Sequence, residues 1–429
     1  MSNLIEPKIL KGFRDFLPEQ EIPRKVLMEK LEEVFRLYGF VPIDTPVLEY
    51  SEILLRKSNG ETEKQVYRFQ DNGGRDIALR FDLTVPFARF VAEHKEELAM
   101  PFKRYHMAKV WRGEKPQAGR YREFIQCDFD TVGTDSAAAD FEILSVMKDS
   151  LNALGVSGVT IHLSHRGIFN RFLEKLGIRE KSEDILRTVD KLGKTGEEEV
   201  LRLLSEITGK PNALEIMEYI KGKDSFEETL TLMEEKSGGE SPDSVRLKEI
   251  YSMLKNSGIE DSFILDPSIT RGLDYYTGIV YETFLNDLPG IGSVCSGGRY
   301  DNLTGLYMKE RLPGVGSSIG LDRLIAGLEE LKLIKKTGSF TKAAIFCQDT
   351  NLMCEYQKIA AELRKNGIST EVFPEEKKMG QQYTWAEKKG IPFGILLSGN
   401  SLSLKNLKTR DTKEGCSLEE VIKALKEQD

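Results

Sequence analysis

The sequence has little that could form a disulfide framework or a structural metal site. Its 429 residues include 5 cysteines and 4 histidines, with no CxxC pair and no Cys/His cluster at zinc spacing. We therefore expect neither zinc nor disulfides. Cys127 has no histidine near it in the sequence, and Cys295 lies among glycines, so both are interpreted as small buried apolar side chains and not as nucleophiles.

Long apolar segments and an excess of positive charge are also missing. No run of 18 apolar residues occurs and the first residues lack a signal-peptide core, so a cytoplasmic protein without membrane contact is expected. The formal net charge is -8, which excludes a global attraction to nucleic acid and leaves only local patches for such contacts. With 40% hydrophobic residues, the chain can form two or three cored domains.

The familiar nucleotide-binding motifs are missing as well. There is no GxxxxGK[ST] loop, and "GIGSVCSGG" (290–298) and "GVGSSIG" (314–320) do not have the GxGxxG spacing. We interpret these glycines as positions where strands turn tightly. Any nucleotide must then be held by other groups.

The segments that are present predict an α+β protein. Short connections between strand-like segments favour a largely antiparallel sheet, because parallel neighbours need long crossovers. An amphipathic helix is predicted at 19–38. The other elements expected in this part are strands at 65–70, 76–81, 103–112, 121–132 and 277–285, and helices at 84–95 and 135–154.

The pattern changes twice along the chain. Residues 168–260 are charged and helix-favouring without a strand pattern, which predicts a helical insertion in a core formed by 1–167 and 261–332. A Lys/Gly/Ser-rich linker is expected at 333–340. Strand and helix patterns then alternate over 341–429, which predicts a small α/β domain with parallel or mixed strands.

The expected strand at 121–132 has one unusual face. Alternate residues place Arg120, Arg122, Phe124, Gln126, Asp128 and Asp130 in one row, whereas the complementary row is mostly apolar. A solvent-facing strand would explain mixed charge without any function. The floor of a polar substrate pocket is the other explanation.

Arginines recur near this row and in two further polar segments, at 269–282 and 316–328. A guanidinium is planar, permanently charged and bidentate toward phosphate oxygens, so several of them suit a polyphosphate. Phe124 offers a face for stacking a base, and Asp82 and Asp130 could hold a cationic small molecule. The set indicates a nucleotide and a small amino compound, handled by positioning and electrostatics.

These motifs together resemble the class II aminoacyl-tRNA synthetases, and in particular the histidyl-tRNA synthetase family, over nearly the whole chain. The helix at 19–38 with Pro46, "VWRGEKPQAGRYREF" (110–124) and "GLDRL" (320–324) resemble the three motifs of the class. "RGLDYYTGIVYE" (271–282) and "GGRYD" (297–301) resemble the histidine enzymes specifically. The resemblance implies a catalytic core, an anticodon-binding domain at 341–429 and a homodimer.

The same resemblance implies a reaction and its residues. Histidine would react with ATP, accompanied by Mg2+, to give an adenylate, and tRNA(His) would then accept the histidyl group. Arg112 and Arg271 would be catalytic, at the α-phosphate, and Gln117 would contact the tRNA acceptor end. The ATP-binding residues would be Arg112, Glu114, Arg120, Arg122, Phe124 and Arg323. The histidine-binding residues would be Asp82, Thr84, Arg112, Gln126, Asp130, Arg271, Tyr275, Tyr276 and Tyr300.

Two other functions remain as alternatives. The first is a catalytically silent relative, the regulatory subunit of ATP phosphoribosyltransferase, which is disfavoured because 341–429 is present and "WAEKKGIPFGILL" (385–397) resembles the anticodon domain. The second is another class II synthetase, such as the glycine or proline enzyme, which "RGLDYYTG" disfavours. The resemblance explains the insertion at 168–260 least, and we hypothesise that it contacts the tRNA acceptor stem.

Overall fold

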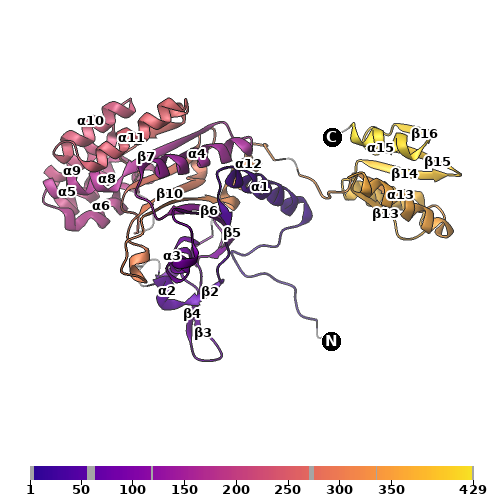
Figure 1. Cartoon of the computed structure of the whole chain (residues 1–429), viewed down its shortest axis with the longest axis horizontal. Coiled ribbons are helices and arrows are strands. Elements are labelled where there is room, and N and C mark those ends of the chain that lie inside the picture. The colour runs from indigo at the N-terminus through magenta and orange to yellow at the C-terminus, as the bar shows by residue number, and fades with distance from the viewer. Residues whose placement is uncertain (1–3, 56–62, 117–118, 270–274, 335, 428–429) are drawn as a thin grey trace. The chain divides into compact units, whose positions relative to one another are not determined.

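The structure is a computed structural model that describes residues 4–55, 63–116, 119–269, 275–334 and 336–427. The chain divides into two compact units (Figure 1). The first consists of Met1–Arg14 and Leu27–Leu333, and the second of Asp15–Val26 and Ile334–Asp429. Within the described residues, no helix is both long enough and apolar enough to span a membrane.

The first unit contains an eight-stranded sheet in the order β1-β5-β6-β11-β10-β9-β7-β8. All pairs from β5 to β7 are antiparallel, and only the outer pairs β1–β5 and β7–β8 are parallel. The predicted, largely antiparallel sheet is therefore confirmed. The strands are β1 (Val41–Pro42), β5 (Phe102–Trp111), β6 (Glu123–Val132), β7 (Val159–His165), β8 (Phe263–Leu265), β9 (Ile279–Leu285), β10 (Cys295–Tyr300) and β11 (Gly314–Gly320).

Helices and a small second sheet complete this part of the unit. The amphipathic pattern of α1 (Pro18–Leu37) buries Phe35, whose ring lies 4.9 Å from that of Phe129 on β6. The apolar face of β6 is thereby covered. The small sheet has the order β2-β4-β3, formed by Leu48–Tyr50, Asp76–Leu79 and Arg68–Gln70. The further helices are α2 (Ser51–Leu55), α3 (Thr84–His94), α4 (Ala137–Ala153) and α12 (Leu321–Glu330).

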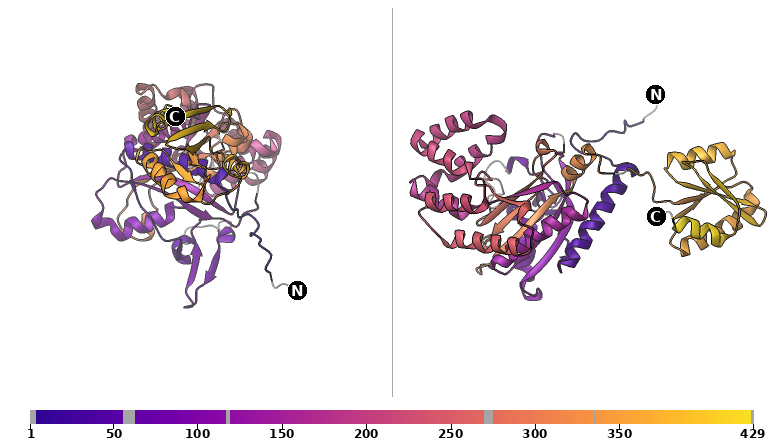
Figure 2. Two further views of the ribbon diagram at one scale, coloured as in Figure 1. Left: turned by 90° about the vertical axis from the view of Figure 1, so that its right-hand side faces the viewer. Right: turned by 90° about the horizontal axis from the view of Figure 1, so that it is seen from above.

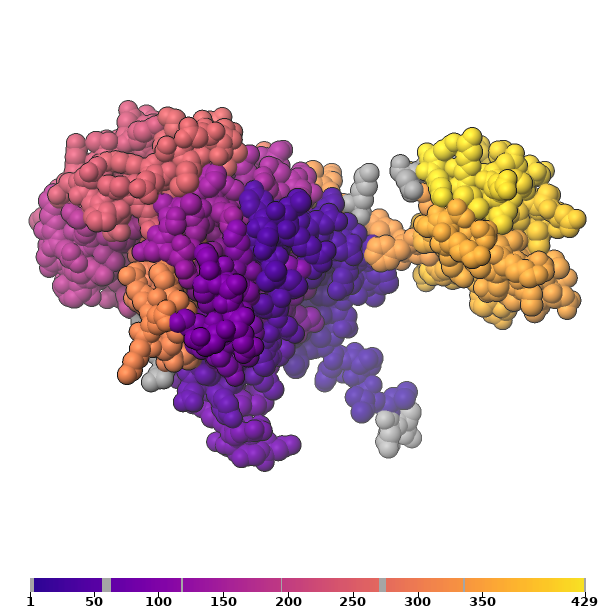
Figure 3. Space-filling view, viewed as in Figure 1, coloured from indigo at the N-terminus to yellow at the C-terminus, as the bar shows by residue number. Residues whose placement is uncertain are grey.

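Between β7 and η4 the described chain is helical. Figures 1 and 2 show these helices gathered together, and in the space-filling view they form one continuous mass (Figure 3). Their core includes Phe172 stacked on Tyr219, with ring centroids 4.5 Å apart. They belong to the same compact unit as the eight-stranded sheet. The helices are α5 (Arg166–Lys175), α6 (Ser182–Val189), α7 (Leu192–Thr195), α8 (Glu197–Thr208), α9 (Lys210–Lys221), α10 (Phe226–Ser237) and α11 (Pro242–Asn256).

The second unit has a mixed five-stranded sheet in the order β13-β12-β14-β15-β16. Alternate residues of β12 enter two different cores, Ala343 and Ile345 on one side and Ala344 on the other. Helices α13 and α15 contribute to the first core and α14 to the second. The elements are β12 (Ala343–Ile345), α13 (Met353–Lys365), β13 (Thr370–Val372), α14 (Met379–Lys388), β14 (Phe393–Ser398), β15 (Ser401–Asn406), β16 (Thr412–Cys416) and α15 (Leu418–Lys426).

Short 3-10 helices occur in both units. They are η1 (Glu63–Gln65), η2 (Lys95–Glu97), η3 (Arg179–Lys181), η4 (Glu260–Ser262), η5 (Pro289–Ile291), η6 (Thr304–Leu306) and η7 (Thr350–Leu352). The strand expected at 65–70 is consequently shorter than predicted, since η1 occupies its first residue and β3 only its second half.

Candidate active site

The polar row on β6 lies inside the molecule. β6 is flanked by β5 and β11, and Gln126, Asp128 and Asp130 are 8%, 1% and 2% exposed. The apolar row is buried on the opposite face, where Phe129 packs against Phe35. The solvent-facing alternative is therefore excluded for these three residues, because both faces of the strand are covered.

Small residues on β11 make room for this row. In the antiparallel register Gly316 lies opposite Asp130, Ser318 opposite Asp128, and Gly320 opposite Gln126. A Cβ atom at Gly316 would overlap the Asp130 carboxylate. The expectation that the glycines of 314–320 mark a tight turn was wrong, because these residues form a strand whose lack of side chains admits the neighbouring carboxylates.

A cavity of about 140 Å³ opens at the Phe124 end of the row. The Arg112 guanidinium lies 5.2 Å from the centre of the Phe124 ring, and its Nε donates to the Phe81 carbonyl at 3.0 Å. Arg323 donates to the Ser293 carbonyl at 2.7 Å, so both cations are anchored to the main chain. The cavity wall includes the predicted residues Arg112, Glu114, Arg120, Phe124, Gln126 and Arg323.

Arg122 does not line this cavity. Its Nε donates to the Glu114 carbonyl at 3.1 Å and one Nη donates to the Lys11 carbonyl at 3.2 Å. These contacts attach the loop before β6 to the N-terminal segment. Of the two arginines considered for the distal phosphates, the structure thus places Arg120 on the cavity and Arg122 beside it.

Asp322 is a cavity residue that the sequence reasoning missed. Its carboxylate accepts a hydrogen bond from the Ile125 amide at 2.8 Å and pairs with Arg14 at 2.5 Å. The Arg14 guanidinium also lies over the Tyr121 ring, 3.1 Å from its centre. Asp322 therefore fixes β6 and the N-terminal segment at the cavity wall. Its position directly before Arg323 was the available signal.

The other end of the row is formed by three buried carboxylates, Asp82, Asp128 and Asp130, which we call the aspartate cluster. Tyr300 donates to Asp130 Oδ1 at 2.7 Å, and Arg104 pairs with Asp130 Oδ2 at 2.6 Å. Arg104 is fully buried and stands opposite Asp130 on β5, so a β-sheet register sets this pair. Sequence reasoning missed Arg104, although the i-to-j pairing of the two predicted strands could have revealed it.

Asp82 joins the cluster from the segment before α3. It accepts from the Val85 amide at 3.1 Å and from the Tyr275 hydroxyl at 3.4 Å, while Thr84 is the buried first residue of α3. The rings of Tyr275 and Tyr276 are 4.9 Å apart, and those of Tyr275 and Tyr300 are 6.0 Å apart. The structure therefore brings together the predicted residues of this end that it describes.

Burial controls the electrostatics of the aspartate cluster. It raises the pKa of the Asp82 carboxyl to about 6 and that of Asp128 to about 7, and it also raises the pKa of Asp130. Arg104 opposes the shift at Asp128 and Asp130, whereas mutual repulsion adds to it at Asp128. Such a cluster is suited to bind a cation or a group that donates N–H hydrogen bonds.

Two predicted residues, Arg271 and Gln117, lie outside the described residues. Among the described residues, no group of three or more His, Cys, Asp or Glu side chains is arranged to hold a metal ion. The site that can be described is thus an arginine-lined cavity with an aromatic face, continuous along one strand with a cluster of buried carboxylates.

Comparisons with known proteins agree with this architecture. A histidyl-tRNA synthetase family model matches residues 12–324, and an anticodon binding domain model matches residues 342–428. The histidine–tRNA ligase of Treponema denticola is 60% identical, with 99% of both chains covered. The histidine–tRNA ligase of Treponema pallidum is 52% identical over 96% of both chains.

Solved structures show the same relationship. Histidyl-tRNA synthetase from Nostoc sp. PCC 7120 superposes with a TM-score of 0.88 at 30% identity, covering 99% of this chain and 100% of that one. A Bacillus halodurans protein described as an ATP phosphoribosyltransferase regulatory subunit/histidyl-tRNA synthetase has a TM-score of 0.75 at 23% identity, with 92% and 100% coverage, and shares the fold.

The antiparallel sheet with its arginine-lined cavity is the catalytic domain of a class II aminoacyl-tRNA synthetase, and an α/β anticodon-binding domain follows it. Within that class, the chain belongs to the histidyl-tRNA synthetase family.

Proposed function

We propose that this protein attaches L-histidine to tRNA(His) in two steps, with ATP as the activating substrate. In the first, a carboxylate oxygen of histidine attacks the α-phosphorus of ATP, and the bond to the β-phosphate breaks to release pyrophosphate. In the second, a terminal hydroxyl of tRNA attacks the carbonyl carbon of the adenylate, losing its proton while AMP leaves. The observation that carries this proposal is one buried strand that joins a nucleotide-type cavity to the aspartate cluster.

The cavity residues provide the proposed nucleotide contacts. Phe124 would stack on adenine, Glu114 would accept from its amino group, and Arg323 would approach from the other side. Arg112 would bind the α-phosphate and the substrate carboxylate, with Arg120 at the distal phosphates. Because guanidinium groups anchored to carbonyls are already oriented, they can stabilise the charge that develops at phosphorus without reorganising.

The aspartate cluster would select the amino acid. Asp82, Thr84 and Gln126 would hold the ammonium and carboxylate of histidine, and Asp130 with the three tyrosines would face its side chain. An amino acid without imidazole would leave buried polar groups unpaired, which disfavours its binding strongly. Arg271 is proposed as a second cation at the α-phosphate, and Gln117 as a contact to the acceptor end of tRNA.

Mg2+ is proposed to enter with ATP, where it would neutralise phosphate charge. The described carboxylates at the cavity wall are Glu114 and Asp322. Asp322 is engaged by Arg14 and by the Ile125 amide, which leaves Glu114 as the protein group available to the ion. Most of the ligands would then come from phosphate and water, as is usual for Mg2+.

The further organisation is also proposed. The catalytic core would be 1–167 and 261–332, the insertion 168–260, the linker 333–340, and the anticodon-binding domain 341–429. The insertion would contact the acceptor stem of tRNA, and deleting it without loss of charging would contradict that role. A homodimer is expected, and exposed apolar residues near β1 and β2, including Val41, Val47 and Leu48, offer a surface for it. Sedimentation of the full chain would test the dimer.

The experiment that tests the function is amino-acid-dependent ATP–pyrophosphate exchange across the twenty amino acids, with Arg112→Ala and Arg271→Ala as variants. Exchange with histidine alone, abolished in both variants, supports the proposed site. A regulatory subunit would give no exchange with any amino acid. That alternative is disfavoured by full-length relatives at 52–60% identity and by the anticodon binding domain at 342–428.

A further inference from the structure

Asp128 is a buried carboxylate that the proposed roles leave unused. It is 1% exposed and lies on β6 between Gln126 and Asp130, on the same face of the strand. Its Oδ1 atom is buried and has no hydrogen-bond partner among the described residues. A buried carboxylate oxygen without a donor is unfavourable, so the position calls for a donor group.

The neighbouring Asp130 is in a different situation. Both of its oxygens have a partner, the Tyr300 hydroxyl at 2.7 Å and the Arg104 guanidinium at 2.6 Å. The same Arg104 nitrogen is 3.9 Å from Asp128. Arg104 therefore neutralises Asp130 first and leaves the charge of Asp128 only partly compensated.

The other groups near Asp128 do not supply the missing cation. Ser318, directly across on β11, gives the carboxylate one neutral hydrogen bond. His106, directly across on β5, directs Nε2 to Asp44 at 3.0 Å, and its pKa is lowered to about 3 by burial and by Arg104 and Arg80. Asp82 and Asp130 add negative charge, and burial raises the pKa values of the hydroxyls of Tyr275 and Tyr276, which stay neutral.

Distance along the strand indicates which substrate group could reach Asp128. Residues two apart on a strand are separated by about 6.6 Å. From Cα of histidine to its far ring nitrogen is only about 5 Å, built from a few bonds of standard length. If the amino acid backbone lies over Gln126, its imidazole reaches the next step of the row, at Asp128, more readily than the second step, at Asp130.

We propose that Asp128 is a specificity-determining residue that accepts a hydrogen bond from an imidazole N–H of the histidine substrate. The inference rests on the proposed function and assigns the ring contact within it. Asp130, held by Arg104 and Tyr300, then forms the closed end of the pocket behind the ring, and Asp82 remains the partner of the ammonium group.

The test is a kinetic comparison of the full-length protein with Asp128→Asn and Asp128→Glu in ATP–pyrophosphate exchange. Asparagine keeps the size of the side chain but removes its charge and places an NH2 group in the pocket. We expect KM for histidine to rise about 10- to 100-fold in Asp128→Asn, with KM for ATP unchanged within about twofold. Asp128→Glu is expected to recover part of the affinity, because the acceptor is retained.

Analogues of histidine identify the group that Asp128 contacts. Imidazolepropionate, which lacks the ammonium group, is used as a competitive inhibitor of the same variants. If Asp128 binds the ring, Asp128→Asn weakens this inhibitor by the same factor as histidine. If its inhibition is unchanged, Asp128 contacts the ammonium group and the ring assignment is overturned.

A matched control separates binding from folding. Asp140 is an equally buried carboxylate outside the row, and Asp140→Asn should lower the Tm without a selective rise in KM for histidine. Equal rises in KM for histidine and ATP in Asp128→Asn, or a lower Tm alone, would show a purely structural role and overturn the proposal. Absence of exchange with histidine in the unsubstituted protein would instead contradict the proposed function itself.

Discussion

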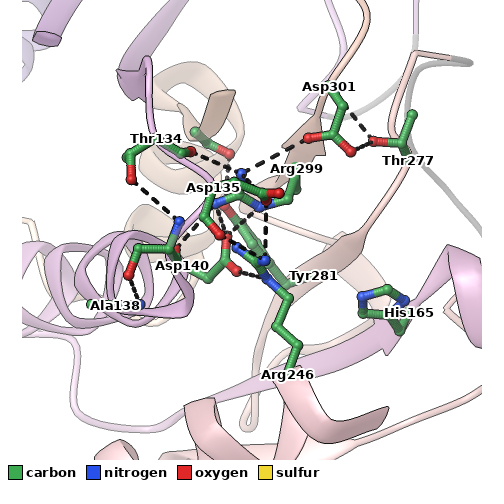
Figure 4. A network of polar contacts seen from close by, with 12 residues as sticks. Thr134, Asp135, Ala138, Asp140, His165, Arg246, Thr277, Tyr281, Arg299 and Asp301 are labelled. Carbon is green, nitrogen blue, oxygen red and sulfur yellow. Dashed lines mark hydrogen bonds and ion pairs between the residues drawn. The ribbon is translucent and has the colours of Figure 1, made fainter. Parts of the chain in front are cut away.

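Two buried carboxylates in the first unit, Asp140 and Asp128, differ in how their charge is balanced. Asp140 is fully buried on α4 and receives Nε of Arg299 at 2.8 Å and Nε of Arg246 at 2.5 Å (Figure 4). Asp128 is almost as buried but shares Arg104 with Asp130. A carboxylate balanced by the protein stabilises the fold, whereas one in excess of its cations is suited to a ligand.

The Asp140 network joins three elements of the unit. Arg299 comes from β10, Arg246 from α11, and Arg299 also donates to the carbonyl of Thr134 at 3.2 Å (Figure 4). His165 lies close by, and burial together with Arg246 and Arg299 lowers its pKa to about 3, so it stays neutral. The network therefore fixes α11 of the helical region against the strand that carries Tyr300.

The largest effect is predicted for Asp140→Ala. Removing the carboxylate leaves two guanidinium groups in a buried site without their anion, which should lower the free energy of unfolding by about 3–5 kcal/mol. Chemical denaturation of the parent and the variant measures this difference. A loss below about 1 kcal/mol would mean that water reaches the arginines, and the contrast with Asp128 would no longer hold.

The second prediction concerns the pH dependence of stability at Asp128. Burial raises the pKa of this carboxyl to about 7, with Asp130 adding repulsion and Arg104 opposing it. A folded-state pKa above the usual value means that this stabilisation is complete below about pH 4 and is lost as the pH rises through 7. The parent should therefore lose roughly 2–4 kcal/mol relative to Asp128→Asn between these pH values.

Denaturation of both proteins at a series of pH values checks this difference. Groups common to both, including the raised carboxyl of Asp82, largely cancel in the comparison. Parallel stability curves for parent and variant would show that Asp128 is ionised at all these pH values, and thus that the protein already balances its charge.

The sequence predicted the fold of this protein well where periodicity was strong. The polar row of β6 and the helix α1 that covers its other face follow from periods of two and of 3.6 residues. The glycines of β11 were misread as a turn, because glycine marks both tight turns and strands that must leave space for a neighbour.

The site was predictable only in part, for a related reason. Phe124, Gln126 and Asp130 were found because they share one strand, and Arg112 and Arg323 because they lie in motifs. Arg104 and Asp322 act across strands or elements, and their partners are set by sheet register and by helix packing. A single sequence contains no direct signal for such pairs, so the charge balance of the aspartate cluster could not be derived from it.

A smaller effect is predicted for Tyr300→Phe. The variant loses the hydroxyl that donates to Asp130 at 2.7 Å but keeps the ring, so that one buried carboxylate oxygen is left with less compensation. KM for histidine should rise by a factor corresponding to about 1–2 kcal/mol, with little change in KM for ATP. Exchange kinetics with either substrate varied provides the measurement, and an equal change in both KM values would assign Tyr300 to the general packing of the unit.

The smallest effect is predicted for Arg202→Ala, which tests whether burial or the number of partners decides these outcomes. Arg202 on α8 pairs with Glu199 at 2.7 Å and with Glu206, so it forms three-membered ion pairing like that of Asp140. Its side chain is 55% exposed, however, and water and salt screen such pairs. The Tm of Arg202→Ala should therefore match that of the parent at low and at high salt. A decrease comparable to that of Asp140→Ala would show that partner number outweighs burial, and the distinction between the two buried carboxylates would then need a different physical basis.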